Sequence, residues 1–317
     1  MELWQQIVKQ AFTSWEALAA YLKLDGEHVL VEPSFPLKVP RRLAEKMEKG
    51  RVDDPLLLQF LPRREEGEVN AAFGIDPVGD MAAQCTERLI QKYRGRVLVV
   101  ATGACAMHCR YCFRQHYPYP KEREMGREFA HIANDETVYE VILSGGDPLS
   151  LPDRILGEWM EQLKAIPHVK RIRFHSRFPM GVPERITPQF LQLLEGDKQI
   201  YFVIHANHPR EFDAEIWEAL EQLKRAGVVL LNQSVLLKGV NDSVEVLKQL
   251  CLDLVDHGVI PYYLHQLDRV QGAAHFEVSH REGHKLMKAL EAELPGYALP
   301  RYVQEISGQP AKSSLLN

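Results

Sequence analysis

The chain has 317 residues, of which 45% are hydrophobic and 26% charged, and its formal net charge is -5 at pH 7. These values are typical of a globular protein that buries a large core, in one enlarged domain or two. The small acidic excess gives no electrostatic footprint for nucleic acid, and no apolar run reaches the length that crosses a membrane. We therefore predict neither a nucleic-acid partner nor a membrane partner.

The first 25 residues mix charged and apolar side chains throughout, unlike the apolar stretch of a secretory leader. The five cysteines do not form a disulfide framework, because three of them are clustered between residues 105 and 112. In a reducing compartment such thiols are better explained as ligands. These features predict a cytoplasmic protein.

Residues 1–90 are expected to form an N-terminal helical extension. Apolar side chains recur at helical spacing at Leu3, Trp4, Ile7, Val8 and Phe12. Ser14 is placed to cap a second helix, and short helices are expected over 43–49 and 55–60. The aromatic side chains here are expected in the core rather than in a functional site.

From residue 95 onward, short apolar runs alternate with amphipathic stretches. The predicted strands are 97–101, 139–143, 171–175, 201–205, 229–234 and 260–264. The predicted helices are 153–166, 188–194 behind the cap Thr187, 211–226 and 243–257. Such alternation is typical of a parallel sheet with crossover helices. Six units predict an α/β fold with a partial (β/α)6 barrel.

Three thiols, Cys105, Cys109 and Cys112, follow the first predicted barrel strand with C-x3-C-x2-C spacing. Three thiolates can hold three corners of a four-iron cluster and leave one iron open for another ligand. Structural zinc requires four ligands, and His108 or His116 could supply the fourth, so zinc is the alternative. The remaining cysteines lack the paired spacing of a zinc site.

Polar residues close or directly follow every predicted barrel strand, where parallel α/β barrels place their chemistry. In chain order these are the cysteine loop, Ser144-Gly145-Gly146-Asp147, Ser176-Arg177, His205-Ala206-Asn207, Asn232-Gln233, and His265-Gln266 with Asp268. A Gly-Gly turn or a histidine at one strand end is commonly structural. Polar residues at the same end of all six predicted strands favour a shared active site.

Several longer motifs carry a resemblance. They are QKYRGRVLVVATGACAMHCRYCFR (91–114), VILSGGDPL (141–149), HANHP (205–209), LLNQSVLLKGVND (230–242) and PYYLHQLDRVQGAAHF (261–276). Over residues 85–314 the chain resembles the lysine 2,3-aminomutase family of radical S-adenosylmethionine enzymes. The resemblance implies a radical S-adenosylmethionine barrel with a [4Fe-4S] cluster, S-adenosyl-L-methionine and pyridoxal 5'-phosphate. It implies an isomerase that moves an amino group from carbon 2 to carbon 3.

The resemblance also assigns residues to the pyridoxal phosphate site. Lys312 matches the lysine that bonds this cofactor, although Gln309, Pro310 and Ala311 stand where the family commonly has glycines, and on sequence alone Lys312 reads as a solvated tail charge. Arg96 matches a contact to the cofactor phosphate. Tyr93 matches an aromatic side chain between the two organic cofactors.

The S-adenosylmethionine site is implied in the same way. The resemblance places Ser144, Gly145, Gly146 and Asp147 beside this cofactor. Asp147, together with His205 and Gln233 at later strand ends, is expected to orient it.

Substrate choice follows from charge. Arg114 matches the family's carboxylate-binding arginine, and a guanidinium can bond a carboxylate with two parallel donors. Asp268 and Glu305 match the positions that hold the far end of the substrate side chain. Two acidic groups suit a cation and repel a glutamate side chain, so L-lysine is the expected substrate. Taken alone, either could be an ordinary surface carboxylate.

The expected domains are 1–90, a barrel over 91–290, and a C-terminal segment over 291–317 that carries Lys312. The chain ends five residues after Lys312, without the metal-binding tail of the catabolic enzymes. This ending is more similar to the branch that makes (R)-β-lysine for elongation factor P, upstream of a separate lysine ligase.

An external one-electron reductant is implied, and the sequence leaves a homo-oligomer open. The alternatives are a catabolic lysine 2,3-aminomutase, a radical enzyme acting on another amino acid or by another reaction, and a non-catalytic iron-sulfur or zinc protein.

Overall fold

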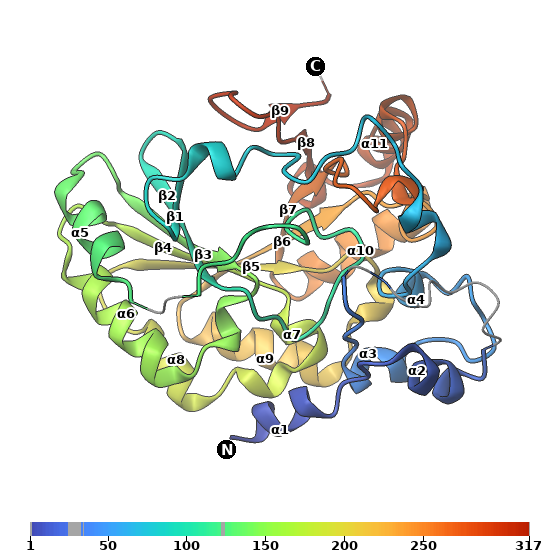
Figure 1. Cartoon of the computed structure of the whole chain (residues 1–317), viewed down its shortest axis with the longest axis horizontal. Coiled ribbons are helices and arrows are strands. Elements are labelled where there is room, and N and C mark those ends of the chain that lie inside the picture. Colours follow the sequence, from blue (N-terminus) through green and yellow to red (C-terminus); the bar gives the residue numbers. More distant parts are fainter. Residues whose placement is uncertain (1, 25–32, 34, 122–123, 317) are drawn as a thin grey trace.

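The computed structural model, which describes residues 2–24, 33, 35–121 and 124–316, is built around one curved nine-stranded sheet (Figure 1). The strands are β1 (Leu89–Tyr93), β2 (Arg96–Thr102), β3 (Glu140–Gly145), β4 (Arg171–Ser176), β5 (Gln199–His205), β6 (Val229–Val235), β7 (Ile260–His265), β8 (Arg301–Gln304) and β9 (Ser313–Ser314). They pair in chain order, and β2 through β8 run parallel. Among the described residues β1 and β9 pair on one side only, so the barrel is partial, as predicted.

All six predicted strands are confirmed as β2 through β7. The first five residues of β3 are all buried, which explains its nearly continuous apolar run. The strands β1, β8 and β9 were not predicted. β1 pairs antiparallel with β2, and β9 pairs antiparallel with β8, so each adds an antiparallel edge to the parallel sheet.

Crossover helices cover the outer face of the sheet (Figure 1). The predicted helices correspond to α6 (Asp153–Ala165), α8 (Pro188–Leu194), α9 (Ala214–Arg225) and α10 (Val244–Asp256). The side chain of Thr187 accepts from the Phe190 amide at 3.0 Å, which confirms this cap. α9 begins later than expected because Asp213 caps it.

Three α-helices of this part were not predicted. They are α5 (Gly126–Asn134), α7 (Phe178–Gly181) and α11 (His280–Glu293). Short 3-10 helices are η2 (Arg64–Gly67), η3 (Met81–Ala83), η4 (Pro148–Ser150), η5 (Pro183–Arg185), η6 (Pro209–Glu211), η7 (Ala274–Phe276) and η8 (Gly296–Ala298). Within the described residues, no helix combines the length and the apolar character that a membrane crossing needs.

The N-terminal helices are α1 (Leu3–Lys9), α2 (Trp15–Leu22), α3 (Arg41–Glu45) and α4 (Pro55–Leu58). Ser14 caps α2, as predicted, by accepting from the Ala17 amide at 3.3 Å. Phe12 lies beyond α1, where its backbone bridges to Val39. α3 and α4 are shorter than the sequence predicts.

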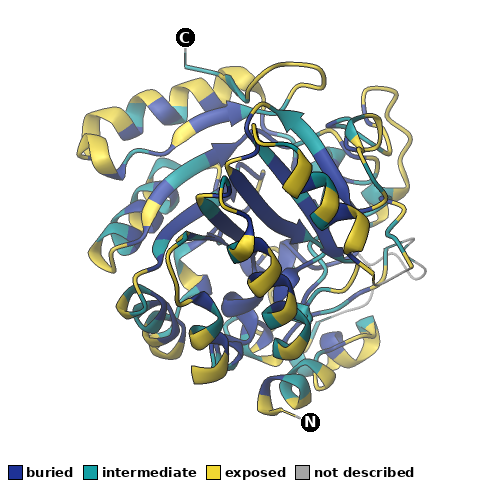
Figure 2. Cartoon of the chain, turned by 90° about the vertical axis from the view of Figure 1, so that its left-hand side faces the viewer, coloured by how far each residue is buried: buried dark blue, intermediate teal, exposed yellow. Residues whose placement is uncertain are grey.

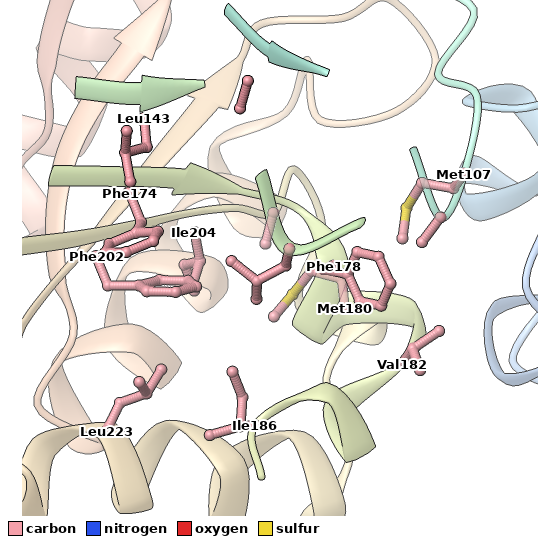
Figure 3. Close-up of a cluster of buried hydrophobic side chains, with 14 of the residues drawn as sticks. Met107, Leu143, Phe174, Phe178, Met180, Val182, Ile186, Phe202, Ile204 and Leu223 are labelled. Atoms are coloured by element: carbon pink, nitrogen blue, oxygen red, sulfur yellow. The ribbon is translucent and has the colours of Figure 1, made fainter. Parts of the chain in front are cut away.

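One hydrophobic cluster extends from the N-terminal helices to the strands, which Figure 2 shows as a buried centre under exposed helix faces. Phe174 and Phe202 stack on neighbouring strands with ring centroids 6.0 Å apart, and Figure 3 shows them beside Leu143 and Ile204. The ring of Trp4, from α1, meets that of Phe178 at 5.6 Å. The domain division at residue 90 stays a prediction, and the core is continuous across it.

Candidate active site

A cavity of about 480 Å³ lies at the centre of the partial barrel. Every residue to which the family resemblance assigned a role lines it: Tyr93, Arg96, Cys105, Cys109, Cys112, Arg114, Ser144, Gly145, Gly146, Asp147, His205, Gln233, Asp268, Glu305 and Lys312. The structure therefore brings all of them together, while the role of each stays a prediction. Of the other polar residues at the strand ends, Asn207, Asn232 and Gln266 are buried but do not line the cavity.

The cysteine loop, between β2 and α5, is held by the N-terminal segment. Lys38 Nζ donates to the Cys105 carbonyl at 2.6 Å, and the His108 amide donates to the Lys38 carbonyl at 2.9 Å. The Arg110 amide donates to the Gln59 carbonyl at 2.9 Å. Residues 38–59 thus shape the backbone that presents the thiols.

The three thiols lie close enough to affect one another's ionisation. Burial and the charge of Cys109 raise the pKa of Cys112 to about 11. Burial, followed by Asp147 and the other two cysteines, raises the pKa of Cys105 well above its usual value. Iron ions supply the positive charge that such crowded thiolates need, so the donor set fits an iron-sulfur cluster.

Both imidazoles that could complete a zinc site contact backbone carbonyls. His108 Nδ1 lies 2.8 Å from the Pro36 oxygen, and His116 Nε2 lies 3.2 Å from the Gln271 oxygen. In the described part of the chain, no group of three or more His, Cys, Asp or Glu could hold a single metal ion. A four-iron cluster differs from such a site because each thiolate binds a different iron.

The Ser144–Asp147 loop requires its two glycines. Gly145 has a φ of +116°, and a Cβ there would lie 2.8 Å from the Thr102 oxygen. A Cβ on Gly146 would lie 2.5 Å from the Ala104 oxygen. The loops after β2 and β3 can approach this closely only without side chains at both positions.

Asp147 joins the loops after β3 and β4. Its carboxylate accepts from Ser176 Oγ at 2.8 Å, from the Arg177 amide at 2.8 Å and from the Leu149 amide at 3.0 Å. Burial raises its pKa to about 6, against these donors. Asp147 therefore fixes the shape of this edge of the cavity, and its contact to S-adenosylmethionine stays a prediction.

Some cavity-lining side chains carry buried nitrogen atoms without a hydrogen-bond partner in the described structure, among them Arg96 Nε, His175 Nε2 and His205 Nε2. Burial lowers the pKa of both histidines well below the usual value, so their imidazoles are neutral. Unpartnered buried nitrogens suit a ligand rich in hydrogen-bonding groups. His175 was missed at the level of sequence, where it appeared only as the end of a strand.

Tyr93 and Arg96 are neighbours because β1 and β2 form a hairpin. Gly95 occupies the turn with a φ of +78°, and the Arg96 guanidinium lies over the Tyr93 ring, 4.7 Å from its centroid. Both residues were expected in one site, although β1 was not predicted.

A chain of alternating charges crosses the cavity: Arg114, Asp80, Lys92, Glu305 and Lys312. Arg114 Nε lies 2.6 Å from Asp80 Oδ2, and Lys92 Nζ lies 2.5 Å from Asp80 Oδ1. Lys92 Nζ also donates to Glu305 Oε1 at 2.8 Å, and Lys312 Nζ pairs with Glu305 Oε2. Asp80 and Lys92 were missed, because Asp80 lies in a turn that shows no periodic pattern.

The two predicted substrate carboxylates have opposite pKa shifts. Burial and Glu305 raise the pKa of Asp268 to about 7. Burial opposes ionisation of Glu305, but Lys312 and Lys92 outweigh it and lower its pKa to about 2. Glu305 is thus already paired, whereas Asp268 gains from a further cation.

Comparison with known proteins agrees with this geometry. Residues 99–251 match the family model "Radical SAM superfamily". L-lysine 2,3-aminomutase of Escherichia coli K12 is 41% identical over 99% of this chain and 94% of its own length. The enzymes of the same name from Haemophilus influenzae and Buchnera aphidicola are 40% and 36% identical, each over 98% of this chain and 94% of their own length.

The matches to the three enzymes extend over nearly the whole chain, and all the matches include the cysteine loop. Radical S-adenosylmethionine enzymes use a [4Fe-4S] cluster and S-adenosyl-L-methionine, which decides between the cluster and zinc. The chain belongs to the lysine 2,3-aminomutase family of radical S-adenosylmethionine enzymes.

Proposed function

We propose that this protein is an L-lysine 2,3-aminomutase, an isomerase that moves the amino group of L-lysine from carbon 2 to carbon 3 to give β-lysine. One observation carries the proposal: three thiols, a lysine amine and two carboxylates line the same cavity. The family relationship supports it.

The chain's residues divide the binding of three cofactors among them. Cys105, Cys109 and Cys112 hold the cluster, and Lys312 Nζ is the amine that bonds pyridoxal phosphate. When bound, the cluster and S-adenosylmethionine would together provide the radical that abstracts hydrogen, using one electron from an external reductant. Pyridoxal phosphate would carry the migrating nitrogen.

Arg96 and Tyr93 belong to the pyridoxal phosphate part of this proposal. The unpartnered Nε of Arg96 supports a phosphate contact. We propose that the Tyr93 ring, which lies under this guanidinium, contacts both organic cofactors from a position between them.

The loop of Ser144, Gly145, Gly146 and Asp147 is proposed to accept S-adenosylmethionine, with His205 and Gln233 opposite. The neutral imidazole of His205 leaves its Nε2 available to this ligand. Asp147 acts mainly by fixing the loop, since protein donors already surround its carboxylate.

Arg114 is proposed to bind the substrate carboxylate. Its Nε donates to the Asp80 carboxylate, and its Nη1 donates to Ser144 Oγ at 3.3 Å. These two hydrogen bonds orient the guanidinium. At the far end, Asp268 and Glu305 bind the substrate ammonium. A glutamate substrate would bring a third carboxylate to this pair, which disfavours it.

We infer that the product serves the modification of elongation factor P rather than catabolism, through a separate lysine ligase. High identity to the Escherichia coli enzyme over 94% of its length supports this branch. A cytoplasmic location accompanies this proposal.

The test is to reconstitute the protein anaerobically, with a reductant, and to add isotopically labelled L-lysine. Labelled β-lysine is expected, with little turnover of glutamate. Failure to convert lysine in protein that carries both the cluster and pyridoxal phosphate would contradict the proposal. The Cys109→Ala variant should lose the cluster, whereas Cys85→Ala, at an exposed free cysteine, should retain it.

A further inference from the structure

Arg177, in the loop after β4, makes a direct contact with a cluster cysteine. Its Nη1 donates to Cys109 Sγ at 2.9 Å. The side chain is only 6% exposed, so this contact is shielded from water. Hydrogen bonds to ligating sulfur atoms are among the main determinants of cluster reduction potential.

The guanidinium is held in this orientation from several sides. Nη2 donates to Gln59 Oε1 at 2.6 Å and to Glu211 Oε2 at 2.9 Å. The Arg177 amide donates to Asp147 at 2.8 Å. Residues from separate segments of the chain thus leave Nη1 directed at the cysteine loop.

Aromatic side chains surround the same guanidinium. It lies over the Phe60 ring, 5.1 Å from its centroid, and Nη1 also contacts the Tyr111 hydroxyl. Asn207 Nδ2 in turn donates to that hydroxyl at 2.6 Å. The buried carboxylate of Glu211 forms an ion pair with this guanidinium.

We propose that Arg177 is a positioning residue for the cluster: it fixes the Cys109 thiolate and raises the reduction potential of the cluster bound there. The inference rests on the proposed function, because Cys109 must be a cluster ligand. In the step concerned, one electron from an external one-electron reductant converts the [4Fe-4S] cluster from 2+ to 1+. No bond breaks and no proton moves at Arg177. A fixed positive charge and an N–H donor at the sulfur favour the more negative, reduced state.

The test is an anaerobic redox titration, followed by electron paramagnetic resonance, of full-length protein with its reconstituted cluster. Arg177→Gln removes the charge and is expected to shift the midpoint potential to a more negative value. Arg177→Lys retains the charge and should recover most of the wild-type potential. The matched control is Arg185→Gln, because Arg185 is also a buried arginine but pairs with Asp153 and with the carbonyls of Leu149 and Leu151. It should leave the potential unchanged.

An unchanged potential in a fully loaded Arg177→Gln protein would overturn the inference, as would an equal shift in the Arg185 control. A second measurement needs no substitution: protein labelled with ¹⁵N in its arginine guanidinium groups should show ¹⁵N hyperfine coupling to the reduced cluster. Absence of that coupling would also overturn it. Iron content separates the two proposals, since wild-type protein that binds no cluster contradicts the proposed function instead.

Discussion

Asp80 and Arg114 form a buried ion pair, with Arg114 Nε 2.6 Å from Asp80 Oδ2. Asp80 is 2% exposed and also pairs with Lys92, so one carboxylate balances two cations at the edge of the cavity. The pair orients the guanidinium that we assign to the substrate carboxylate. It also links that end of the site to Glu305 and Lys312 through Lys92.

Replacing Asp80 with Asn should destabilise the protein, because the buried Arg114 loses its counter-charge and Lys92 keeps only its pairing with Glu305. Breaking a buried pair in this way costs about 3–5 kcal/mol, which chemical denaturation of the protein would measure. The control is Glu158→Gln, which breaks the exposed pair Arg154–Glu158 and should change stability little. Equal losses in the two variants would contradict a special role for the buried pair.

The pH dependence of lysine use should report Asp268. Its pKa of about 7 means that the carboxyl group is protonated below neutrality, and only the ionised form attracts the substrate ammonium. We therefore expect kcat/KM to rise about tenfold per pH unit below pH 7 and to level off above it.

Asp268→Asn should remove the rise of kcat/KM with pH below pH 7. It should also lower kcat/KM by roughly thirtyfold or more, which corresponds to a loss of about 2–5 kcal/mol in binding free energy. Cluster loading should be retained. Asp197→Asn, at a side chain that is 80% exposed, should keep the wild-type profile. A variant at position 268 with the wild-type pH profile would exclude Asp268 from the substrate site.

Lys312→Ala should abolish covalent attachment of pyridoxal phosphate. Treatment with borohydride, followed by mass spectrometry, should show the added cofactor on the wild-type protein and none on the variant. Lys238→Ala removes an exposed lysine and should behave as wild type. Cofactor still fixed to the Lys312 variant would show that another lysine bonds it.

Gly146→Ala should distort the loop that we assign to S-adenosylmethionine. The added Cβ would lie 2.5 Å from the Ala104 oxygen, so the cysteine loop must shift. Overpacking of this kind costs about 1–3 kcal/mol, and thermal unfolding would detect it together with reduced cluster loading. Gly126→Ala is the control, since none of the residues that the structure describes lies within 4 Å of the position that a Cβ would take there, and the residue begins a helix. Unchanged stability and cluster loading in both variants would contradict the close approach of Gly146 to the Ala104 carbonyl.

The barrel was predictable because its strands are largely buried and therefore appear as apolar runs between amphipathic helices. β1 was missed because its sequence, LIQKY, is half polar, and β9 because it has only two residues. α11 does carry a local signal, since Ser279 and Glu282 form a capping box at its start. α5 has no side-chain cap, so its beginning is harder to recognise.

The site was predictable at the strand ends and from the family motifs, but its pairings were not. Lys92 and Glu305 are 213 residues apart in the chain, and Arg177 and Cys109 are 68 apart. No local pattern encodes such contacts, because they arise only when distant strands assemble. Asp80 shows this most clearly, since its significance comes entirely from Arg114 and Lys92.

The attachment of the cysteine loop to residues 38–59 bears on how the protein acquires iron. Hydrogen bonds with Lys38 and Gln59 hold the backbone of this loop. Because the protein itself makes these contacts, we expect the folded chain to present the cysteine loop close to its cluster-binding conformation. Cluster binding then costs little conformational entropy for ordering this loop. Damage by oxygen that strips the iron would then leave a protein that can be refilled rather than one that must be degraded.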